Sequence, residues 1–214
     1  MSQHPTNLTP PTRPDPLAID GQRLGSPDIE TLPDPLAEAS VGQAVNFAHG
    51  DVEILTQKLE GRQRRITAAI HIPFGLDQVW QVLTDYDHLA DFIPNLTRSQ
   101  RLPHPTGGIR LEQIGAQCFL NIRFCARVVL DMVERFPQEL GFSMVEGDFR
   151  QFEGAWRLEP VSLEEGQGTR LVYDLLVLPP RAMPAGLIER HIRHNLYENL
   201  AAIRARTLQK FAAV

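Results

Sequence analysis

The stretch Val145-Glu-Gly-Asp-Phe-Arg-Gln-Phe-Glu-Gly-Ala-Trp-Arg-Leu-Glu-Pro160 combines a turn with a strand whose apolar residues recur at every second position. Successive side chains of a strand point to opposite faces, so this strand has one apolar and one polar face. The apolar face carries Phe152, Gly154, Trp156 and Leu158. A glycine beside a tryptophan leaves space next to a large ring. We therefore expect this strand to line a cavity.

The same alternation recurs on both sides of this stretch and predicts an antiparallel sheet. A hairpin with its turn at Glu60–Gly61 opens the folded region, and its second strand ends before Pro73. Further strands are expected at residues 97–102, 109–114, 120–135, 140–145, 149–160 and 169–178. The pattern predicts about seven strands in a meander.

Helical spacing replaces the alternation in two regions. Residues 76–86 and 89–93 are expected to form two short helices, the second of which ends at Pro94. A long helix is expected from Pro184 to about Phe211. Its apolar stripe consists of Ile188, Ile192, Leu196, Leu200, Ile203, Thr207 and Phe211. The order of elements predicts an α+β domain in which a curved sheet grips the C-terminal helix, with a pocket between them.

The first 50 residues differ in composition from the remainder of the chain. Eight of the 17 prolines lie in the first 35 residues, and residues 1–50 hold six acidic and two basic side chains. We therefore predict a disordered, proline-rich, acidic tail at 1–50 and a folded domain at 51–214. A docking tail for a partner is the alternative. The domain is close to neutral, which gives no argument for binding nucleic acid.

The sequence also gives an expectation about where in the cell the protein is located. Its start has neither a basic leader nor an apolar run, and no apolar run approaches the roughly 20 residues that cross a bilayer. Cys118 and Cys125 are too few for a disulfide framework. We expect a cytoplasmic protein. Peripheral contact with a membrane is the alternative, because the last helix has a basic face and Phe92–Pro94 forms an apolar tip.

Several segments of the chain resemble the START-like superfamily, also called SRPBCC or helix-grip proteins. The resemblance is to the group described as polyketide cyclase/dehydrase or coenzyme Q-binding START proteins. The matching segments are Val79–Tyr86, Phe92–Asn95, Val145–Phe149, Phe152–Leu158 and Arg190–Leu200. The resemblance spans about residues 51–211 and implies a helix-grip fold that binds quinones, lipids or other hydrophobic molecules. A smaller enzymatic branch implies the alternative of a polyketide-type aromatase/cyclase or dehydrase, because a fold does not fix a ligand.

Residues that could support catalysis are few. Asp85 and His88 lie in one short segment and suit either an acid/base pair or a polar helix end. His191 and His194 are three residues apart, but no further ligand with zinc-enzyme spacing accompanies them. We therefore predict no catalytic residue, no metal site and no cofactor. The enzymatic alternative would use Tyr173, Asp85 or His88 as proton donors.

The apolar lining is thus the predicted site, and its ligand is a hydrophobic small molecule, either an isoprenoid quinone or a lipid. The predicted binding residues are Phe92, Ile93, Phe124, Phe142, Met144, Trp156, Tyr173, Ile192 and Leu196. A tail that buries about 300 Å² would gain about 7 kcal/mol before ordering costs. The competing interpretation is that these side chains fill a solid core.

Overall fold

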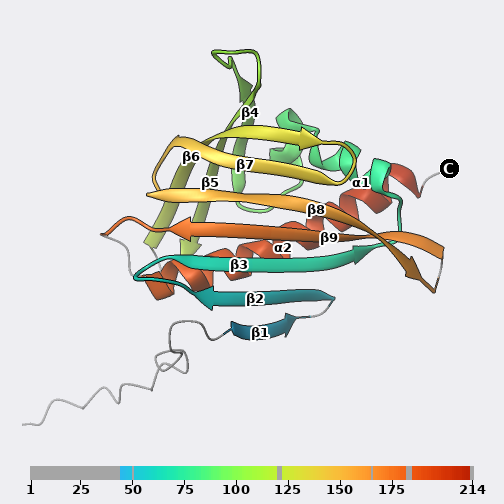
Figure 1. Cartoon of the computed structure of the whole chain (residues 1–214), viewed down its shortest axis with the longest axis horizontal. Helices are drawn as coiled ribbons and strands as arrows, with labels where there is room; N and C mark the ends of the chain where they lie inside the picture. Colours follow the sequence, from blue (N-terminus) through green and yellow to red (C-terminus); the bar gives the residue numbers. More distant parts are fainter. Residues whose placement is uncertain (1–43, 50, 120–121, 165, 182–184, 213–214) are drawn as a thin grey trace, which may run out of the picture. The chain divides into compact units, whose positions relative to one another are not determined.

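The computed structural model describes residues 44–49, 51–119, 122–164, 166–181 and 185–212 (Figure 1). In this part of the chain, nine strands form one antiparallel sheet in the order β1-β2-β3-β9-β8-β7-β6-β5-β4. The strands are β1 (Ala44–His49), β2 (Val52–Lys58), β3 (Arg64–Ile72), β4 (Leu96–Leu102), β5 (Ile109–Phe119), β6 (Ile122–Arg135), β7 (Glu139–Gly147), β8 (Gln151–Leu163) and β9 (Gly166–Leu178). The helices are α1 (Leu76–Leu83), the 3₁₀ helix η1 (Tyr86–Asp91) and α2 (Ala185–Phe211).

The predicted α+β helix-grip architecture is confirmed, but the described sheet has nine strands instead of about seven. One difference is the edge strand β1, which pairs with β2 from Ala44↔Gln57 to His49↔Val52. It lies within the stretch that we assigned to the tail. Only Val45 and Phe47 alternate there, so the pattern is too short to separate from the proline-rich segment before it. Residues 1–43 lie outside the described residues.

Helix α2 packs across one face of the sheet, against β2 and β3, and also contacts α1 (Figure 1). The strands bury every second residue toward this side, as the predicted hairpin requires. The stripe of α2 is fully buried at Leu200, Ile203 and Thr207, and the Thr207 hydroxyl donates to the Ile203 carbonyl at 2.8 Å. No helix among the described residues is both long enough and apolar enough to span a bilayer.

A buried ion pair fixes the first turns of α2 to the sheet. The Arg64 Nε atom lies 3.0 Å from Glu189 Oε2, and both side chains are almost completely shielded from solvent. The neighbouring Arg62 guanidinium donates to the carbonyls of Pro180 and Arg181, both at 3.0 Å, just before the helix. A buried charge is tolerated when it is paired, so these contacts set the position of α2 over β3.

The other face of the sheet is polar. Asp174 on β9 is bound by Arg65 from β3 at 2.5 and 2.9 Å, and Arg157 from β8 lies 3.4 Å away. The hydrogen bond from Arg65 is the main cause that lowers the pKa of the Asp174 carboxyl. Arg157 belongs to the polar parity of β8, so the predicted division of this strand into a polar and an apolar face is confirmed.

Gly154 on β8 lies at a close contact between neighbouring strands. It lies opposite Phe142 on β7 and Leu175 on β9. A Cβ atom built there would overlap the Asp174 carbonyl and would lie 2.9 Å from Cζ of Phe142. The expectation that Gly154 leaves open space is therefore wrong. The Phe142 ring occupies that space, and the missing side chain allows the backbones to approach closely.

Candidate functional site

Two adjoining chambers lie between the apolar face of the sheet and α2, with volumes of about 190 and 170 Å³. The first extends toward α1 and η1, where Leu83 and Tyr86 line it. The second extends toward the start of α2, where His191 and Ile192 line it. The lining residues that they share are Leu96, Gln113, Gly115, Phe152, Tyr173, Asn195, Leu196 and Asn199. Large side chains therefore do not fill this interior completely.

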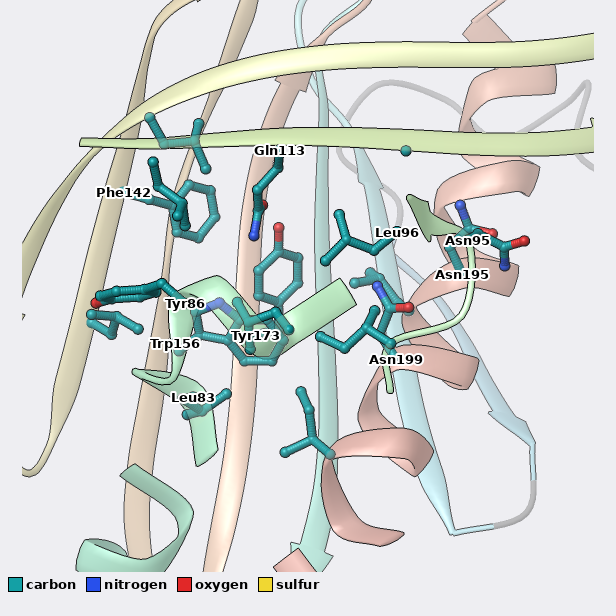
Figure 2. A pocket seen from close by; sticks show the side chains of 18 of the residues that line it. Leu83, Tyr86, Asn95, Leu96, Gln113, Phe142, Trp156, Tyr173, Asn195 and Asn199 are labelled. Carbon is teal, nitrogen blue, oxygen red and sulfur yellow. The ribbon is translucent and has the colours of Figure 1, made fainter. Parts of the chain in front are cut away.

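An aromatic wall formed by Phe142, Phe152, Trp156 and Tyr173 closes the sheet side of the cavity. The Phe142 and Tyr173 rings are stacked at a centroid distance of 5.6 Å with an interplanar angle of 13°. The Trp156 ring lies 4.2 Å from Tyr173 (Figure 2). Offset and tilted ring pairs are favourable, so strands β7, β8 and β9 hold these rings in a preformed surface.

The structure brings most of the predicted binding residues to this cavity. Those that line one or both chambers are Ile93, Phe142, Trp156, Tyr173, Ile192 and Leu196. Phe92 and Met144 line neither chamber. The Phe92 ring faces the Arg206 guanidinium at 5.6 Å, and Met144 lies where β7 has already separated from β8, with its sulfur beside Gly147. Phe124 lies in β6, but its side chain is outside the described residues.

Three amide side chains that line both chambers were not among the predicted residues: Gln113 on β5, and Asn195 and Asn199 on α2. Figure 2 shows the Gln113 amide and the Tyr173 hydroxyl pointing toward one another, and the two asparagines on successive turns of α2. The Oδ1 atoms of both asparagines are buried and have no hydrogen-bond partner in the part of the chain that the structure describes. The asparagines follow Ile192 by three and seven residues, so helical spacing places them beside the apolar stripe.

The two tyrosines of the cavity remain protonated. Burial is the main cause that raises the pKa of the Tyr173 hydroxyl, and the nearby Asp174 charge adds to it. Burial also raises the pKa of Tyr86, whose hydroxyl donates to Glu134 Oε1 at 2.7 Å. The Tyr86 donor is therefore already used. The Tyr173 hydroxyl has no hydrogen-bond partner among the described residues and can donate to a ligand.

The candidate acid/base residues of the sequence do not meet in the cavity. Asp85 Oδ1 lies 2.6 Å from His88 Nδ1, but the His88 side chain is 63% exposed and neither residue lines a chamber. This contact raises the pKa of His88. Such a pair at the protein surface suits an ordered helix end better than proton transfer to a buried ligand.

The two histidines of α2 lie in different environments. His191 is buried and lines the second chamber, and burial lowers its pKa. His194 is exposed and lies 3.4 Å from Glu198. Within the described ranges, no group of three His, Cys, Asp or Glu side chains is arranged to hold a metal ion.

The loop Ile93–Leu96 covers one side of the first chamber. Asn95 adopts a left-handed conformation with φ of 63°, which asparagine tolerates better than most residues. Its carbonyl accepts from the Ala116 amide at 2.8 Å, and its side-chain amide donates to Glu198 Oε2 at 2.8 Å. Asn95 therefore fastens the loop to β5 and to α2 at the same time.

Replacing Glu198 with alanine is expected to loosen this loop while leaving the fold intact. The substitution removes the acceptor of the Asn95 amide, a bond that contributes about 1 kcal/mol. Hydrogen–deuterium exchange should become faster at the Ala116 amide and across the loop. His194→Ala, which removes only the imidazole beside Glu198, should leave this exchange unchanged. Equal exchange rates in Glu198→Ala and the wild type would contradict the assignment.

A family model described as polyketide cyclase/dehydrase and lipid transport matches residues 72–204, which is more than half of the chain. The chain belongs to this family. The match includes α1, most of the sheet and the part of α2 that lines the cavity. A search of curated protein sequences finds no match.

Solved structures show the same START-like helix-grip fold. A STAR-related lipid transfer protein from Xanthomonas axonopodis is 13% identical, with a TM-score of 0.61, over 78% of this chain and 99% of that one. The ZhuI aromatase/cyclase from Streptomyces sp. R1128 is 16% identical, with a TM-score of 0.59, over 71% and 97%. Human STARD10 is 11% identical, with a TM-score of 0.59, over 80% and 75%. At these identities the likeness establishes the fold alone.

Proposed function

We propose that this protein binds a hydrophobic small molecule between the sheet and α2 and carries it without changing it chemically. The main support is the preformed cavity, whose walls are aromatic and aliphatic apart from a few neutral polar groups. The family description, which includes lipid transport, agrees with this function. An isoprenoid quinone or a lipid is the ligand class that we favour, with the predicted lining residues and the shared polar groups as the binding site.

The size of the cavity limits the part of the ligand that enters. Pockets for small molecules commonly measure about 300–1,000 Å³, whereas the two chambers measure about 190 and 170 Å³. A single ring system or a short chain segment fits this space. The remainder of a longer ligand would extend past the loop Ile93–Leu96. A burial gain of about 25 cal/mol per Å² makes micromolar affinity attainable for such a ligand.

The polyketide-type aromatase/cyclase or dehydrase alternative has less support. Asp85 and His88 lie outside the cavity, so of the three proposed proton donors only Tyr173 lines it. Burial raises the pKa of its hydroxyl, which makes it a weak acid, and none of the described residues that line the cavity carries a carboxylate. These features suit hydrogen bonding to a ligand better than proton transfer.

The proposal also includes the place where the ligand is exchanged. We place the protein in the cytoplasm, in transient contact with a membrane surface from which a hydrophobic ligand is taken. Pro94 is exposed at the tip of the loop over the first chamber, and α2 carries basic side chains such as Arg190 on its exposed side. Apolar tips and basic helix faces favour association with anionic lipid surfaces.

The direct test is to purify the full chain and to identify its bound molecules by native mass spectrometry. We expect one lipophilic molecule per chain, or else saturable micromolar binding of decylubiquinone and of a fluorescent fatty acid. The recovered ligand should be chemically unchanged. Absence of a bound lipophile together with absence of binding to both probes would refute the proposal, and conversion of a polyketide-like compound would favour the cyclase alternative.

A further inference from the structure

We infer that Asn195 and Asn199 select a neutral ring ligand with hydroxyl groups along one edge, and that each Oδ1 accepts a hydrogen bond from a ligand hydroxyl. The inference rests on the proposed function and specifies the ligand that the cavity prefers. Within the quinone class, it favours the reduced quinol, because quinol hydroxyls donate hydrogen bonds whereas quinone carbonyls only accept them.

The two amides have unsatisfied oxygen atoms. Both Oδ1 atoms are buried without a hydrogen-bond partner among the described residues, and both residues line both chambers. Most buried polar side-chain atoms have a partner, because an unpaired one costs free energy in the folded protein. A ligand that donates to these atoms removes this cost, so a donor is worth more here than in a uniformly apolar pocket.

The two asparagines lie on the same side of α2. Residues four apart on a helix face the same way, with Cβ atoms about 5–6 Å apart. Asn195 and Asn199 therefore lie along one side of the cavity, opposite the aromatic wall (Figure 2). Their Oδ1 atoms are shielded from solvent, and rotation of each amide about its terminal side-chain bond would turn the oxygen toward a ligand. A flat ring system with two hydroxyls on one edge can meet both acceptors while its face contacts Tyr173 and Phe142.

The described lining of the cavity is uncharged. The described residues that line the two chambers include no Asp, Glu, Lys or Arg. A charged ligand group would lose its hydration here without gaining a counter-charge, which is unfavourable. The arrangement thus favours a neutral hydroxylated ring over a carboxylate or a phosphate head group. The two chambers are also too small for both chains of a two-chain lipid.

The test compares naphthalene-2,7-diol with 2,7-dimethoxynaphthalene, which has the same ring but no hydrogen-bond donor. Isothermal titration with the wild-type protein is expected to show at least about tenfold tighter binding of the diol, since two hydrogen bonds distinguish the compounds. The double variant Asn195→Leu/Asn199→Leu should lose this preference and keep its affinity for the ether. Gln209→Leu, an amide replacement at an exposed position of the same helix, should retain the preference.

The outcomes separate this inference from the proposed function. Equal binding of the diol and the ether to the wild type, or a preference that persists in the double variant, would overturn the inference and leave the binding function standing. Failure of both compounds and of decylubiquinone to bind would overturn both. If the double variant does not fold by circular dichroism, the single variants Asn195→Ala and Asn199→Ala provide the same comparison.

Discussion

Replacing Gly115 with leucine is expected to abolish ligand binding while the protein still folds. Gly115 lies in β5 and lines both chambers, as does Gln113 two positions earlier on the same face of the strand. A Cβ atom at this position would lie 3.6 Å from the Asn95 carbonyl oxygen, an ordinary van der Waals contact. The backbone therefore accepts a side chain, and the added isobutyl group extends into the cavity.

The expected loss of affinity is at least about 100-fold, or about 2.7 kcal/mol. A ligand would have to share the remaining space with the leucine, and overpacking of that kind costs about 1–3 kcal/mol in addition to lost burial. Titration with decylubiquinone measures the effect, and thermal unfolding shows that the variant is folded. Gly115→Ala, which adds one methyl group, should keep most of the affinity. Unchanged affinity in Gly115→Leu would place the ligand outside this cavity.

Replacing Gly154 with valine is expected to give the largest loss of stability. The new Cβ would overlap the Asp174 carbonyl on β9, and a backbone atom cannot move aside as the end of a flexible side chain can. The Phe142 ring, 2.9 Å from that Cβ position, would also have to leave its stack on Tyr173. We expect a decrease of about 3 kcal/mol or more in the free energy of unfolding.

Urea unfolding of the purified variant measures this decrease. The matched control is Gly186→Ala in α2, because a Cβ there meets no atom within 4 Å. Alanine loses less backbone freedom in a helix than glycine does, so the control should be at least as stable as the wild type. Similar stabilities for Gly154→Val and the wild type would show that the strands are not in the close contact described here.

The strand alternation and the helical stripe of α2 made the fold predictable from the sequence. Both patterns arise because one side of a strand or helix is buried. The spacing of apolar residues within that one segment of sequence is therefore enough to detect them. Gly154 could not be interpreted in this way. Its role depends on the Asp174 carbonyl of a neighbouring strand, and residue spacing says nothing about how closely two backbones approach.

The candidate site was predictable only in its apolar part. Trp156 and Tyr173 follow the strand parity and line the cavity. Met144 has the same parity as Phe142 but lies beyond the point where β7 and β8 separate, and a register shift opposite Val129 and Leu130 disturbs that end of the strand. Asn195 and Asn199 have the correct helical spacing, but their side chains are polar, so the pattern of apolar residues does not identify them.

The absence of formal charge from the described lining has a further consequence for how the protein works. Dissolved salt changes ligand binding mainly by screening charged groups. None of the described residues that line this cavity is an Asp, Glu, Lys or Arg. Loading should then resemble partition between water and an organic phase, in which the least soluble compound of suitable shape has the advantage. Occupancy would follow the supply of that compound rather than the ionic strength around the protein.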